Sequence, residues 1–74
     1  MEKYIIYYNE TETCKQYVGT IYRNSKSTYT DIGEAIEFND KETAIMVKDY
    51  MNKREGTTKY KVMCIRTTID EEVE

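Results

Sequence analysis

The segment KYIIYY, residues 3–8, constrains the fold of this chain more than any other stretch. After the first lysine every residue is β-branched or aromatic, which favours a β-strand. Side chains alternate between the two faces of a strand, and here both faces are apolar. The two sets are Tyr4, Ile6 and Tyr8 on one face and Ile5 and Tyr7 on the other. We therefore expect a central strand rather than an edge strand.

The length of 74 residues bounds the rest of the fold. It predicts a single domain over residues 1–69, with the acidic tail 70–74 (DEEVE) too charged to pack and therefore frayed. A chain of this size buries only about 60% of its surface on folding. Large rings compensate, since one buried tyrosine removes about 150–250 Å² from water. The eight tyrosines are thus interpreted as core, the alternative being that some lie exposed and bind a partner.

Residues 14–22 (CKQYVGTIY) predict a second strand that forms an antiparallel hairpin with the first. Gly19 inside it indicates a bulge or a close approach by another backbone. This second strand is a candidate sheet edge, open to strand addition. A third strand is expected at Thr28–Thr30, at residues 35–38 (AIEF), or at both; we favour AIEF, because a helix-start signal follows Phe38 directly.

That signal is the sequence NDKE, in which Asn39 as N-cap and Glu42 three residues later form a capping box. The helix is predicted over about residues 40–53, with Gly56 just past its end. The expected buried stripe is Ala44, Val47, Tyr50 and Met51, with Lys48 mostly away from it. Residues 58–68 predict the last strand. The order β-β-β-α-β indicates an α+β fold, a mostly antiparallel sheet with one helix on one face and the other face open.

The composition argues against catalysis. No histidine is present, so neither a histidine-dependent catalytic triad nor a histidine metal site can form. The three glycines stand alone and make no phosphate loop. We expect no enzyme activity, no catalytic residues, no metal and no cofactor.

The two cysteines, Cys14 and Cys64, are too few for a secreted disulfide scaffold. We interpret them as reduced, small core residues, the alternative being a disulfide if their strands are neighbours. No run is long enough for a signal peptide or a membrane span. The expected location is therefore the cytoplasm, away from the membrane; the resemblance described below implies that of a bacterial host cell.

The charge is unevenly distributed. The net charge is −3, and the stretch from residue 31 to residue 42, here called the acidic segment, has five carboxylates against one lysine. One interpretation is a solvated face with favourable charge at the helix N-terminus. The other is a surface complementary to a basic protein. Nucleic acid is not expected as a partner, because the net charge is negative and the glycine-and-aromatic signature of RNA-binding sheets is absent.

The pattern K-Y-I-I-Y, then Y-V-G, then E-A-I-E-F-N-D-K-E-T-A, then Y-K-V-M resembles small accessory proteins of phages and prophages of Gram-positive bacteria, over roughly residues 3–66. That class includes inhibitors of host defence of the anti-CRISPR type and inhibitors of other host enzymes. The resemblance implies a protein that acts by occupying a surface. It carries over no site residue.

Our leading hypothesis is a non-enzymatic inhibitor that docks on a host nuclease or another nucleic-acid-processing protein. The alternative is a small structural or regulatory domain that homodimerises through its sheet, with or without weak nucleic-acid binding. The candidate protein-binding residues are Asp31, Glu34, Glu37, Asp40, Glu42, Asp49, Tyr17 and Tyr22.

Overall fold

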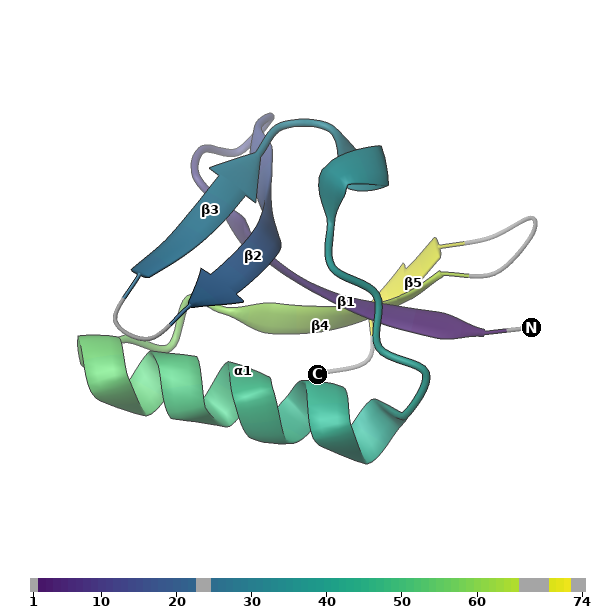
Figure 1. The fold of residues 1–74 in the computed structure, drawn as a ribbon. Helices are drawn as coiled ribbons and strands as arrows, with labels where there is room; N and C mark the ends of the chain where they lie inside the picture. Colours follow the sequence, from purple (N-terminus) through teal and green to yellow (C-terminus); the bar gives the residue numbers. More distant parts are fainter. Residues whose placement is uncertain (1, 23–24, 66–69, 73–74) are drawn as a thin grey trace.

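The computed structural model describes residues 2–22, 25–65 and 70–72 (Figure 1). These residues form an antiparallel sheet in the order β3-β2-β1-β4-β5, with the helix α1 across one face. The strands are β1 (Lys3–Asn9), β2 (Lys15–Tyr22), β3 (Ser25–Tyr29), β4 (Lys61–Ile65) and β5 (Asp70–Glu72), and the helices are η1, a 3₁₀ turn (Ile32–Glu34), and α1 (Lys41–Glu55). The α+β prediction is confirmed, and so is the antiparallel pairing of the first two strands.

The position of β1 at the centre of the sheet is also confirmed. Its helix-side residues, Ile6 with Tyr4 and Tyr8, belong to a core cluster that contains Ala44 and Met51 of α1. Its other side contributes to a second cluster, in which Ile5 is 0% exposed and Tyr7 is 2% exposed. Two apolar faces on one strand therefore led to two separate cores.

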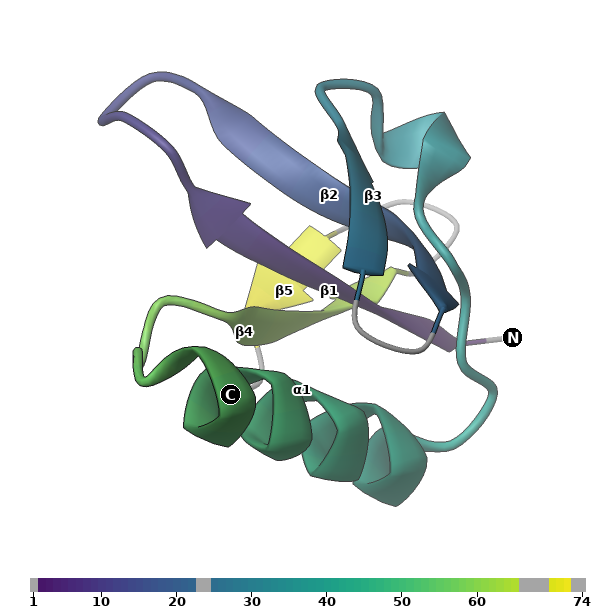
Figure 2. The same cartoon turned by 60° about the vertical axis from the view of Figure 1, so that its left-hand side comes forward.

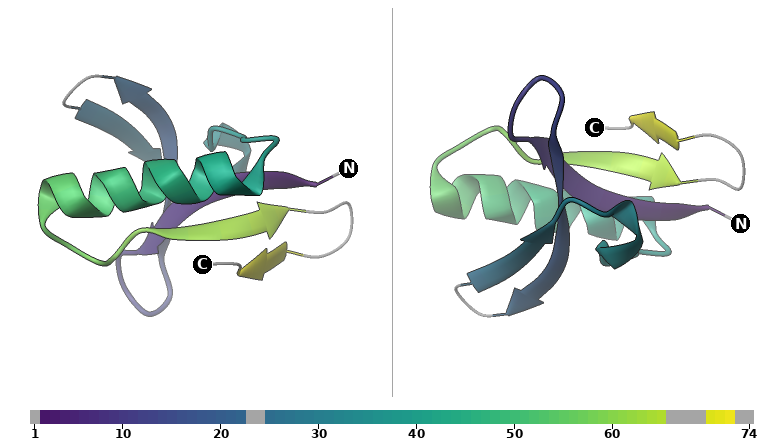
Figure 3. Two further views of the ribbon diagram at one scale, coloured as in Figure 1. Left: turned by 90° about the horizontal axis from the view of Figure 1, so that it is seen from below. Right: turned by 90° about the horizontal axis from the view of Figure 1, so that it is seen from above.

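The prediction that the face opposite the helix stays open is wrong at the centre of the sheet. Ile32 and Ala35, from the chain between β3 and α1, pack against the second cluster. Figure 3 shows η1 and α1 on opposite sides of the sheet. The connection from β3 to the helix therefore covers this face at the centre of the sheet, so the face that we predicted to be open is not exposed there.

The third strand is Ser25–Tyr29 rather than AIEF. Residues 36–38 are extended, yet only Phe38 forms an isolated bridge, to Tyr4. The amide of Ile36 donates to the carbonyl of Val18 on β2 (2.9 Å), and Phe38 exchanges two hydrogen bonds with Tyr4 on β1 (2.8 Å each). Residues 36–38 lie where β2 diverges from β1, so this segment forms backbone hydrogen bonds with both strands without forming a ladder.

The divergence is linked to Gly19. The β2–β3 register shifts between Val18 and Thr20, which is the bulge that the sequence indicated. A close approach is present as well, because a Cβ at Gly19 would lie 2.9 Å from the carbonyl oxygen of Glu34 and would overlap the ring of Tyr29. The prediction of β2 as an edge is wrong, since β3 pairs with its outer side.

The helix begins at Lys41, one residue later than predicted, and its N-cap is shifted by the same one residue. Asp40, not Asn39, is the N-cap and accepts a hydrogen bond from the amide of Thr43. Gly56 ends the helix with φ of 66°, as predicted.

The buried stripe of α1 is Ala44, Lys48 and Met51, and Tyr50 is 58% exposed, against our prediction for both Lys48 and Tyr50. At 100° per residue Tyr50 lies about 120° from Ala44, whereas Lys48 lies about 40° from it. The lysine stem covers apolar surface while its ammonium pairs with Asp49 at 2.8 Å.

A polar cluster fastens β3 to the end of α1. Lys26 forms an ion pair with Glu55 (3.0 Å), and the buried Tyr60 donates its hydroxyl to the same carboxylate (2.8 and 2.9 Å). The neighbouring Tyr60 hydroxyl and the Glu55 carboxylate raise the pKa of Lys26, against the effect of burial. Desolvation would raise the pKa of Glu55, but its hydrogen bonds with Lys26 and Tyr60 outweigh this and lower it.

The end of the chain differs from the prediction. Asp70–Glu72 form the short strand β5 on β4, although we expected residues 70–74 to fray; residues 73–74 lie outside the described part. Strand pairing uses backbone groups alone, so a charged sequence can complete the ladder of β4. Within the predicted last strand, residues 58–60 precede β4 and residues 66–68 lie outside the described residues.

Both cysteines are free. Cys64 is buried in β4, as predicted for a small core residue, whereas Cys14 is only half-buried and lies in the turn before β2. Because β1 lies between β2 and β4 in the sheet, the two cysteines do not come from neighbouring strands.

Candidate functional site

The acidic segment runs along one side of the molecule, from η1 to the first turn of α1 (Figure 1). Two of its carboxylates also act as helix caps. Asp31 accepts a hydrogen bond from the amide of Gly33 (2.9 Å) at the start of η1. Asp40 accepts from the hydroxyl of Thr43 (2.7 Å) and from its amide (3.1 Å), and these bonds lower the pKa of Asp40. Both carboxylates are exposed, so capping leaves them accessible from solvent.

The other three carboxylates of the segment, those of Glu34, Glu37 and Glu42, are also exposed. Within the described residues none of the five forms an ion pair with a lysine or an arginine. The nearby Lys3 directs its ammonium to the side-chain oxygen of Asn39. The segment therefore presents negative charge that no ion pair among the described residues neutralises.

Asp49 lies on α1, outside residues 31–42. It lies seven residues along α1 from Glu42, which is about 10 Å at 1.5 Å per residue. Its carboxylate pairs with Lys48, and its side chain is 64% exposed. Seven residues at 100° per residue make almost two full turns, so Asp49 and Glu42 lie about 20° apart around the helix axis, on the same side of α1.

The two candidate tyrosines occupy different environments on β2. Tyr17 belongs to the second core cluster beside Ile32 of η1, and its ring lies 6.4 Å from that of Tyr7. Tyr22, at the far end of β2, is 65% exposed. The structure thus brings Tyr17 next to the start of the acidic segment and leaves Tyr22 apart from it.

The sheet tyrosines do not form a stacking platform for bases. Tyr4 and Tyr8 pack against the helix-side core, and the ring of Tyr8 meets the edge of Tyr60 at a centroid distance of 5.5 Å. Lys59 sits over the ring of Tyr8 at 4.4 Å, which occupies a face that a base would need. Among the candidate binding surfaces, the acidic segment has all five of its carboxylate residues exposed.

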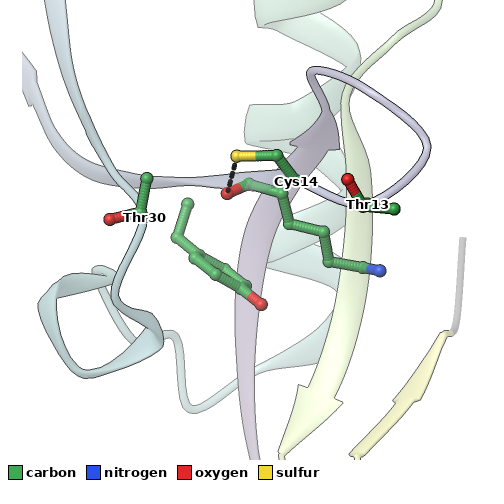
Figure 4. Close-up of a pocket in the computed structure, with 5 residues that line it drawn as sticks. Thr13, Cys14 and Thr30 are labelled. Carbon is green, nitrogen blue, oxygen red and sulfur yellow. Dashed lines mark hydrogen bonds between the residues drawn. The ribbon is translucent and has the colours of Figure 1, made fainter.

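One feature was missed by sequence reasoning. A pocket of about 440 Å³, open to solvent, lies at the start of β2 beside the end of β3 (Figure 4). It is lined by Thr13, Cys14, Lys15, Tyr17 and Thr30. Thr30 stands far from the other four in the sequence, and only the β2–β3 register brings it to them. No sequence signal could have found this pocket.

Among the described residues, no cluster of three or more cysteine or acidic side chains is arranged to hold a metal ion. No helix in the described part has the length and apolar character needed to cross a bilayer. Comparisons of the chain with protein-family models, with curated proteins and with solved structures found no match.

Proposed function

We propose that this chain is a non-catalytic binding protein that docks on a basic protein surface through the acidic segment. The observation that carries the proposal is the exposure of all five carboxylates without an ion pair in the described part, while Tyr4 and Tyr8 of β1 pack against the helix-side core. Negative charge of this kind accelerates encounter with a positive surface and opposes wrong partners.

The class of partner follows from the same chemistry. Proteins that process nucleic acid carry lysine- and arginine-lined grooves for phosphates. A row of carboxylates on a small rigid body can occupy such a groove in place of the phosphates. Together with the resemblance to phage accessory proteins, this supports an inhibitor of a host defence nuclease or of another nucleic-acid-processing enzyme.

The test begins with a pull-down from bacterial lysate, followed by association kinetics with the purified partner. The triple variant Glu34→Lys, Glu37→Lys and Glu42→Lys should associate at least about tenfold more slowly at low salt and less so at high salt. A matched pair sharpens the result, because Glu37→Lys and Glu12→Lys make the same charge change at exposed sites. Only the first should slow association. Equal rates for the two variants would remove the acidic segment from the mechanism.

The homodimer alternative has to use a different strand from the one predicted. Since β2 is interior, the edges in the described sheet are β3 and β5. On β3 the charged Lys26 turns inward to Glu55, a feature that natural edges use against edge-to-edge pairing. A chromatographic size that stays monomeric across a concentration series would exclude the dimer.

A further inference from the structure

The strand position beside the start of β2 is vacant in the described part of the chain. Tyr29, the last residue of β3, pairs with Tyr17. A continued register would set Thr30 opposite Gln16 and Asp31 opposite Lys15. Instead Asp31 turns the chain away, because it caps η1. The first residues of β2 therefore extend beyond the end of β3.

The backbone of Lys15 points into this vacant position. The carbonyl of Cys14 faces the other side, since it accepts the amides of Glu10 (2.9 Å) and Thr11 (3.2 Å) at the β1–β2 turn. Successive residues of a strand direct their N–H and C=O groups to alternate sides, so those of Lys15 face the β3 side. There the carbonyl of Lys15 has the thiol of Cys14 beside it, at 4.0 Å (Figure 4).

Lys15 is also one of the residues that line the pocket described above. Its volume of about 440 Å³ falls within the range of about 300–1,000 Å³ that is usual for ligand sites. Beside the N–H and the C=O of Lys15, the residues that line the pocket carry three hydroxyl groups, those of Thr13, Tyr17 and Thr30. This matches an extended polypeptide, which can add to a strand through its own backbone.

The charges beside the pocket select the side chains of such a polypeptide. Glu10 places its carboxylate 3.9 Å from the sulfur of Cys14 and accepts a hydrogen bond from the amide of Gln16 (3.1 Å). Asp31, the first carboxylate of the acidic segment, follows Thr30 directly. The ammonium of Lys15 lies over the ring of Tyr7, 5.8 Å from its centroid. The carboxylates of Glu10 and Asp31 can therefore pair with basic side chains of such a polypeptide.

We propose that an extended, basic segment of the protein partner adds to β2 at Lys15, in the strand position that β3 leaves vacant. The proposal rests on the proposed function, because the same partner would continue onto the acidic segment from Asp31. It adds a specific backbone contact to a surface that otherwise acts through charge alone.

The test uses the synthetic peptide acetyl-Arg-Val-Arg-Val-Arg-amide as the probe and two variants at one residue. Lys15→Pro removes the outward N–H at the first residue of a strand, where proline is tolerated. Lys15→Gln removes the charge and keeps the N–H. Binding is followed by amide chemical shifts and by the alkylation rate of Cys14 with iodoacetamide. Cys64, which is 2% exposed, is the internal reference for unfolding.

We expect the peptide to shift the amide signal of Lys15 and to slow the alkylation of Cys14. Lys15→Gln should retain this binding, and Lys15→Pro should weaken it by about tenfold, as the loss of one hydrogen bond predicts. A probe with alternate N-methylated amides, which cannot pair with a strand, should leave the alkylation rate unchanged in the unmodified protein. This comparison needs no variant, so it holds even if Lys15→Pro fails to fold.

Equal affinity of the two Lys15 variants, or equal protection of Cys14 by the methylated probe, would overturn the proposal. Shifts confined to residues 31–42 with no protection of Cys14 would also overturn it, while leaving the charge-based function intact. A different outcome would support the strand site and refute the acidic-segment function. In that case the peptide protects Cys14, but the Lys variants of Glu34, Glu37 and Glu42 bind the partner as fast as the unmodified protein.

Discussion

The hydroxyl of Tyr60 offers the sharpest test of what holds the β2–β3 hairpin to the rest of the fold. The substitution Tyr60→Phe keeps the buried ring and removes only the donor to Glu55, whose two carboxylate oxygens lie 2.8 and 2.9 Å away. A hydrogen bond to a charged group contributes about 1.5–3 kcal/mol. Since the side chain of Glu55 is 27% exposed and water can partly replace the hydroxyl, we expect the low end, about 1.5 kcal/mol.

This is a large effect for so small a protein, because the total stability of such a domain is about 4–11 kcal/mol. Urea unfolding followed by circular dichroism measures it. With a slope near 1 kcal/mol per molar, the midpoint should fall by about 1.5 M. The control is Tyr50→Phe, which removes the same hydroxyl from an exposed ring and should change the free energy of unfolding by less than about 0.5 kcal/mol.

The pH dependence supplies an independent check. Because the folded-state pKa of Glu55 is lowered, its stabilisation is present above the ordinary glutamate pKa and is lost as the pH falls through the folded value. The cost of Tyr60→Phe should therefore be full near pH 7 and smaller at pH 3. A cost that stays constant between these two pH values, or equal costs for Tyr60→Phe and Tyr50→Phe, would refute the role assigned to the cluster.

Three further predictions concern the backbone and the helix start. Gly19→Ala should lower the free energy of unfolding by about 2 kcal/mol in urea, because its methyl group would meet the carbonyl of Glu34 at 2.9 Å; an unchanged midpoint would contradict this close approach. Gly56→Ala should cost about 1 kcal/mol in the same assay, because φ of 66° disfavours a side chain, and a stabilised variant would exclude that conformation. Asp40→Ala should destabilise the protein near neutral pH by removing the bonds to Thr43. The stability difference between this variant and the unmodified protein should shrink in acid, since the pKa of Asp40 is lowered in the fold. Thermal melts at pH 7 and pH 3 measure it, and an equal difference at both pH values would contradict the role of Asp40.

Local sequence determined β1, its hairpin with β2, and the helix α1. The alternation in residues 3–8 was enough to place β1 in the sheet centre, because side-chain direction along a strand depends on the backbone alone. Gly19 and Gly56 were identified for the same local reason, as positions where a Cβ or an ordinary φ is excluded. The acidic segment was visible as well, since exposure of charge follows from composition.

The tertiary structure decided how these elements cover one another. Residues 36–38 form no strand, because they lie between β1 and β2, where Ile36 bonds to one strand and Phe38 to the other. The chain between β3 and α1 covers the sheet face opposite the helix with Ile32 and Ala35. No local sequence pattern predicts this contact. The pocket at Lys15 arises because β3 stops at Tyr29, opposite Tyr17, so it depends on the length and register of a distant strand. Such features rest on contacts between residues far apart in the chain, and a local sequence pattern contains no information about those contacts.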